Sequence, residues 1–130
     1  MALTLNDPSL LVERCYVGGA WIGEPVTPVT NPATGETIAR VPQFGAEEAT
    51  RAVEIAQAAF KPWAARTAKE RSAILRRWFD LIIANRDDIG LIMTSEQGKP
   101  LAEAKGEVDY AAGFIEFFAE EAKRIYGETI

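Results

Sequence analysis

Residues 100–126 constrain this chain more than any other feature, because they form one long segment of helical periodicity without an internal proline. Their main apolar stripe, spaced by three and four residues, is Leu101, Ala104, Val108, Ala111, Ile115, Phe118, Ala122 and Ile125. A second stripe holds Tyr110, Phe114 and Phe117, and we interpret it as core, with an apolar pocket as the alternative. The segment predicts a helix, closed by Gly127, with more apolar surface than one partner layer covers.

Three further helices are predicted before it, two of them before residue 85. Residues 46–60 have helical periodicity, and Pro62 is expected to end that helix near Phe60. The stripe predicted for this helix is Ala49, Val53, Ala56 and Phe60. Thr67 and Glu70 have the spacing of a capping box, so a second helix is predicted to start with the next residue after Thr67. The inner face predicted for it is Ile74, Leu75, Trp78, Leu81 and Ile82.

A third helix is predicted between residues 85 and 97. Residues 85–88 provide a break followed by an acidic first turn, which favours a helix N-terminus. Gly98 is expected to adopt a left-handed conformation after that helix, and Pro100 to lie in the first turn of the long helix. Lys99 lies between them, and we interpret it as part of a rigid junction rather than as an anion site.

The first 45 residues are rich in glycine, proline and β-branched residues and predict two β-hairpins. Gly18 and Gly19 can supply the positive φ of a tight turn, and residues 31–35 have turn chemistry between two extended segments. The predicted organisation is therefore hairpins in residues 1–45 and helices in residues 46–127. Residues 128–130 are expected to begin a strand.

Charge and missing residue types argue against several functions. The net charge of −5 offers no positive excess for nucleic acid or an anionic membrane surface. No apolar run approaches the roughly 20 residues that span a bilayer. The sequence contains no histidine, the commonest general base and metal ligand, and no glycine-rich phosphate loop. We therefore predict no nucleic-acid partner, no membrane insertion, and no catalytic or cofactor-binding residue here.

The single cysteine, Cys15, cannot form an internal disulfide. No N-terminal stretch combines a basic start with an apolar run, so a reduced, cytoplasmic setting is expected. Cys15 lies in a predicted strand without a neighbouring base, and we interpret it as a small packing residue rather than as a nucleophile.

Five segments together resemble aldehyde dehydrogenases, in family order. They are YVGGAW at residues 16–21, VTNPATGE at 29–36, Trp63 with TAKER at 67–71, EQGKPLAEA at 96–104 and FFAEEAKRIYGETI at 117–130. The run 106–130 is most similar to the succinate-semialdehyde dehydrogenase group, with glutarate-semialdehyde relatives left open. The resemblance implies an α/β fold in which residues 1–130 are the N-terminal portion of the NAD(P)-binding domain. Its hairpins and about four helices would flank the cofactor domain, with the catalytic domain outside this chain.

The resemblance also implies a function. The parent enzyme would be a homo-oligomer, dimer or tetramer, oxidising succinate semialdehyde to succinate with NADP or NAD through a cysteine thiohemiacetal. Tyr110 and Phe114 would lie near the substrate channel, and Val29, Thr30 and Glu96 would form a monovalent-cation site. These 130 residues alone are expected to be inactive. A non-catalytic structural or interaction module and a small ligand-binding domain remain the alternatives.

Overall fold

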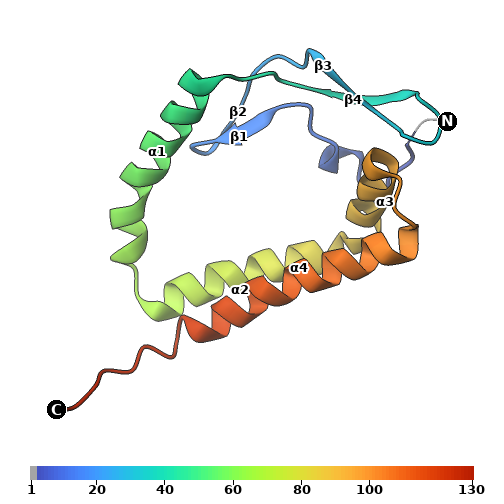
Figure 1. The fold of residues 1–130 in the computed structure, drawn as a ribbon. Coiled ribbons are helices and arrows are strands. Elements are labelled where there is room, and N and C mark those ends of the chain that lie inside the picture. The colour runs from blue at the N-terminus through green and yellow to red at the C-terminus, as the bar shows by residue number, and fades with distance from the viewer. Residues whose placement is uncertain (1–2) are drawn as a thin grey trace.

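The computed structural model describes residues 3–130, whose elements follow one another around an open ring (Figure 1). A short 3-10 helix, Pro8–Leu10, precedes the hairpin of β1 (Cys15–Val17) and β2 (Ala20–Ile22). The second hairpin pairs β3 (Thr27–Thr30) with β4 (Thr37–Val41). The helices are α1 (Ala46–Ala64), α2 (Ala68–Ala84), α3 (Arg86–Gln97) and α4 (Leu101–Glu121). Within residues 3–130, the prediction of two hairpins followed by four α-helices is confirmed.

Local turn and cap chemistry positions these elements. Gly18 and Gly19 have φ values of 61° and 88°, which fit a two-residue turn with positive φ at both positions. The capping box of α2 is present: the Thr67 amide donates to the Glu70 carboxylate at 2.8 Å, and the Glu70 amide donates to Thr67 Oγ1 at 3.3 Å. Gly98 has a φ of 80° and ends α3, as predicted.

Two predicted helix ends are wrong. α1 continues through Pro62 to Ala64, because a proline near the end of a helix removes one hydrogen bond without preventing the next residues from adopting helical φ and ψ. α4 begins at Leu101 with Pro100 as its N-cap and ends at Glu121, before Gly127. Residues 128–130 form no strand, since no described strand lies beside them to pair with; the segment extends away from the helices (Figure 1).

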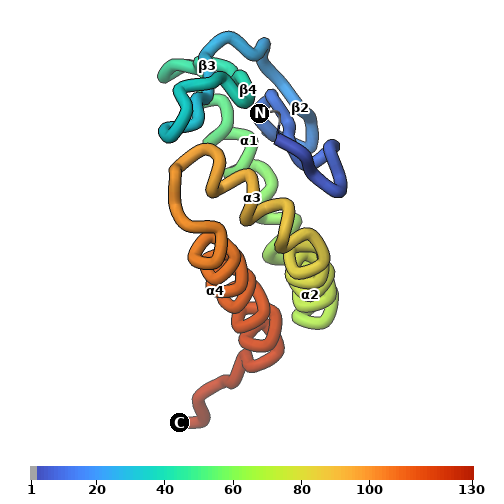
Figure 2. Tube along the Cα trace, turned by 90° about the vertical axis from the view of Figure 1, so that its right-hand side faces the viewer, coloured from blue at the N-terminus to red at the C-terminus, as the bar shows by residue number. Residues whose placement is uncertain are grey.

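The helices α2 and α4 lie side by side and α3 packs on α4 (Figure 2). Small side chains make this interface: Ala104, Ala112 and Ala119 are fully buried and Val108 nearly so. Arg76 of α2 pairs with Glu116 at 2.7 Å and Glu120 at 3.0 Å, and Arg86 pairs with Asp109. The core between the helices is therefore narrow and flanked by ion pairs.

Many large apolar side chains remain outside this core. On α2, Ile74, Trp78 and Leu81 were predicted to face inward, yet each is more than 40% exposed. α1 buries none of its residues, and its predicted stripe is open, with Val53 68% exposed. No helix within residues 3–130 is long and apolar enough to cross a bilayer. Several helix faces are thus apolar without a partner among the described residues.

Candidate functional site

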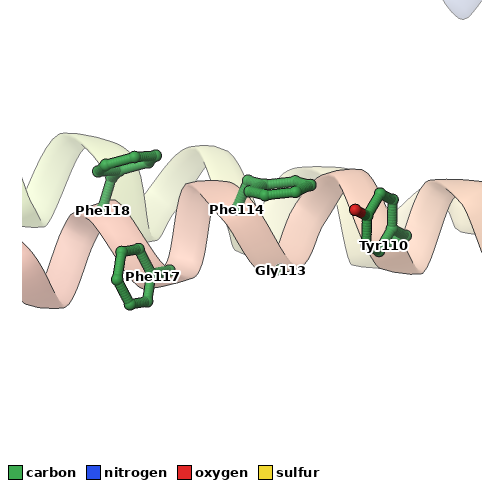
Figure 3. A pocket seen from close by; sticks show the side chains of 5 residues that line it. All are labelled: Tyr110, Gly113, Phe114, Phe117 and Phe118. Carbon is green, nitrogen blue, oxygen red and sulfur yellow. The ribbon is translucent and has the colours of Figure 1, made fainter.

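Four aromatic side chains lie along one exposed side of α4, which we call the aromatic face: Tyr110, Phe114, Phe117 and Phe118. Each is at least half exposed. With Gly113 they line a hollow of about 470 Å³ (Figure 3). All five lining residues belong to α4, so the hollow is open towards any layer that packs over this helix.

The rings of the aromatic face are arranged in two edge-to-face pairs. The centroids of Tyr110 and Phe114 are 4.8 Å apart with an interplanar angle of 79°. Those of Phe117 and Phe118 are 5.3 Å apart at 81°. A Cβ added at Gly113 would meet no atom within 4 Å, which leaves the space between the rings free. The rings therefore stabilise one another in the preferred geometry of aromatic pairs while their faces stay accessible.

The chemistry of the aromatic face is that of binding, not of bond making. The Tyr110 hydroxyl is the one side-chain polar group among its lining residues. Within residues 3–130, no group of three His, Cys, Asp or Glu side chains could hold a metal ion. The surface can contact an apolar or aliphatic molecule, but it offers neither a nucleophile nor a base.

The structure brings together the two predicted substrate-channel residues, Tyr110 and Phe114, and adds Phe117 and Phe118 to them. Phe118 was predicted to lie in the core and is 58% exposed instead. The predicted stripe follows a strict seven-residue repeat, which drifts by about 20° per heptad around a straight helix. The observed buried line runs through Val108, Ala112 and Ala119, and this drift turns Phe118 outward.

The predicted cation residues lie on neighbouring elements. Val29 and Thr30 end β3, where a bulge interrupts pairing with β4, and Glu96 lies in the last turn of α3. α3 and β3 contact each other. The exposed Glu96 lines a hollow of about 360 Å³ whose lining residues do not include Val29 or Thr30. The two sides of the predicted site are adjacent, without forming one common cavity.

Lys99 lies at a tight junction between α3 and α4. Its ammonium pairs with Glu107, so its charge is already matched inside the chain. A Cβ at Gly98 would lie 2.9 Å from Pro32 Cγ, which adds steric crowding to the requirement for positive φ. Both observations support the interpretation of this segment as a rigid junction.

Asp88 is a buried carboxylate that sequence reasoning placed only in an acidic first turn. Its Oδ1 accepts from the Asn6 backbone amide at 3.0 Å and from Asn6 Nδ2 at 2.9 Å, and its Oδ2 accepts from the Asp7 amide at 2.8 Å. The backbone hydrogen bonds from Asn6 and Asp7 lower the pKa of Asp88. No local pattern could reveal these partners, which lie more than 80 positions earlier in the sequence.

Comparisons with known proteins agree along almost the whole chain. A sequence model of the aldehyde dehydrogenase family matches residues 21–130. Glutarate-semialdehyde dehydrogenase of Pseudomonas putida is 58% identical over 98% of this chain and 27% of its own length. Succinate-semialdehyde dehydrogenase [NADP(+)] of Escherichia coli is 52% identical over the same shares. The crystal structure of an aldehyde dehydrogenase from Brucella melitensis biovar abortus has a TM-score of 0.93 and 60% identity, covering 98% of this chain and 27% of that one.

Proposed function

We propose, from the premise that this chain belongs to the aldehyde dehydrogenase family, that it is the scaffold part of an NAD(P)-dependent oxidoreductase. The observation that carries the proposal is its similarity, over almost all its length, to two semialdehyde dehydrogenases. The chain spans 27% of the length of these relatives. In this proposal, the hairpins and helices flank the cofactor domain, and the reacting groups belong to other parts of the enzyme.

The proposed substrate is succinate semialdehyde, which is oxidised to succinate; glutarate semialdehyde is the alternative. A cysteine thiolate outside these residues adds to the aldehyde carbonyl to form a thiohemiacetal, and water releases the acid from the later thioester. NADP or NAD, bound elsewhere in the enzyme, would supply the hydride acceptor for this oxidation. The 130 residues have no glycine-rich phosphate loop, so they do not fit the role of a cofactor cradle.

The aromatic face supports a role beside the substrate channel. Tyr110 and Phe114 present ring surface that suits the methylene groups of a semialdehyde. The lining residues of this hollow include no cation, so the substrate carboxylate would have to bind elsewhere in the enzyme. Aromatic rings in this position would guide the aliphatic part of the substrate and exclude water from it.

A matched pair of variants tests the channel role. We expect Phe114→Ala to raise the KM for the semialdehyde about tenfold, because its ring contacts are lost, with a smaller change in kcat. Phe60→Ala removes another ring that is more than half exposed, from α1, and should leave KM unchanged. Equal KM values in the two variants would contradict a role for Phe114 in the substrate channel.

The monovalent-cation site of Val29, Thr30 and Glu96 is a further part of the proposal. Backbone carbonyls at the β3 bulge and the Glu96 carboxylate are the hard oxygen ligands that such a cation prefers. Potassium should therefore raise the melting temperature of the protein, and Glu96→Gln should abolish that rise. Glu103→Gln, an exposed change on α4, is the control. A potassium effect that survives in Glu96→Gln would contradict the site.

The enzyme proposal is tested by measuring intact mass together with nicotinamide reduction. Activity with succinate semialdehyde above that with glutarate semialdehyde is the expected result for a protein of several times 14.2 kDa. The proposed assembly is a cytoplasmic homo-oligomer, dimer or tetramer, which sedimentation of the same sample would measure. No turnover of either aldehyde by the intact protein would favour the alternative, a non-catalytic structural or interaction module.

A further inference from the structure

The hairpins and the helices are connected at two places, and the contacts at these two places differ. Along the chain, α1 connects the hairpins to α2, yet α1 buries no residue, and in residues 3–130 it approaches the first hairpin, where Ile55 lies beside Gly18, rather than packing broadly on another helix. At the opposite corner of the ring, α3 contacts β3 (Figure 1). The position of the second hairpin relative to the packed helices therefore depends on contacts near α3.

The N-terminal segment passes through this same corner and is hydrogen-bonded at both ends. At one end, the buried Asp88 of α3 accepts the backbone amides of Asn6 and Asp7. At the other end, the Glu13 carboxylate accepts the backbone amide of Arg40 in β4.

Between its two ends, the segment is stiffened by local bonds. Asp7 caps the 3-10 helix by accepting the Ser9 amide at 3.0 Å and the Ser9 hydroxyl at 2.6 Å. A stiff segment transmits displacement from one anchor to the other, whereas a flexible one would allow each anchor to open alone.

We infer that residues 6–13 form a strap that ties α3 to β4 and so holds the second hairpin against the helices. Asp88 is the positioning residue at its helical end, and Glu13 at its hairpin end. In this proposal release of either anchor loosens the other, because the capped 3-10 helix is joined to Glu13 only through the short segment of residues 11–13. The strap rests on these contacts alone and does not depend on the proposed dehydrogenase activity.

Hydrogen exchange of single backbone amides in the intact protein tests the strap. Asp88→Asn removes the charge and one of the two accepting oxygens, so the amides of Asn6 and Asp7 should exchange about tenfold faster or more. The Arg40 amide, bonded at the far end, should also exchange about tenfold faster if the strap moves as one piece. Asp80→Asn, the same change at an exposed site on α2, should alter none of these rates.

A variant at the other anchor, Glu13, tests the strap from its hairpin end. Glu13 is exposed, so Glu13→Ala should leave the helical core folded. It should speed exchange at the amides of Asn6 and Asp7, while the buried amide of Val108 in α4, the control, stays protected. If Asp88→Asn fails to fold, this variant decides alone. Unchanged rates at Asn6 and Asp7 in Glu13→Ala, or an unchanged rate at Arg40 in a folded Asp88→Asn, would show two independent contacts and overturn the strap.

Discussion

The two sides of α4 differ in the size of their side chains and in how far these are exposed. The side towards α2 and α3 carries alanines that are fully buried, whereas the aromatic face carries four rings that are each at least half exposed. The buried side packs small side chains against its neighbours, and partly exposed ion pairs lie at its edges. The aromatic face contributes little burial inside this chain, which fits a surface that meets another layer or a ligand.

The largest effect is expected on the buried side. Ala112→Leu forces a larger side chain into a site with no free surface, so it should lower the free energy of unfolding by about 1–3 kcal/mol. Urea unfolding followed by circular dichroism measures this change. A decrease in the free energy of unfolding of less than about 0.5 kcal/mol would mean that α2 and α4 separate easily. The buried side would then not be more tightly packed than the aromatic face.

The neighbouring residue should respond with the opposite sign. Gly113→Ala adds a methyl group where no atom lies within 4 Å, and alanine is the better helix former. The free energy of unfolding should therefore rise by about 0.5–1 kcal/mol. The same urea experiment applies. A decrease would indicate that the space above Gly113 is filled in the protein, so that the hollow of the aromatic face is not open.

Acid should weaken the ion-paired edge of the buried side. Hydrogen bonding from Arg86 lowers the pKa of Asp109 below its ordinary value of 3.8. A carboxylate with a lower pKa in the folded state adds stability above its unfolded pKa, and this stability is lost as pH falls through the folded value. The urea concentration at the midpoint of unfolding should therefore decrease as the pH is lowered below 4. Arg86→Met should make this decrease smaller. Arg77→Met, which removes an exposed cation, should leave it unchanged.

The sequence predicts well what short-range chemistry determines. Thr67 and Glu70 specify a helix start because the two side chains satisfy each other's amides. Gly18 and Gly98 specify turns because their positive φ is rare for other residues. The aromatic stripe that includes Tyr110 and Phe114, and the excess of apolar surface on its helix, could also be identified by spacing, but spacing did not show which stripe is exposed.

Short-range chemistry does not determine which face of each helix is buried or which residues far apart in the sequence contact each other. Phe118 and Trp78 are large and apolar, and a rule that large apolar residues are buried places them inside; the structure buries alanines instead. The choice depends on which layers are present, and periodicity alone does not contain that information. The bond between Asp88 and Asn6 depends in the same way on the arrangement of the whole chain.

The smallest effect is expected on the aromatic face, and it sharpens the contrast most. Phe117 is 56% exposed and packs mainly against Phe118, so Phe117→Gln should change the free energy of unfolding of this chain by less than about 0.5 kcal/mol. Urea unfolding beside Ala112→Leu provides the comparison. A loss of about 3 kcal/mol or more, typical of a buried phenylalanine, would show that another layer covers the face. The two sides of α4 would then both be core, one formed within these residues and one formed outside them.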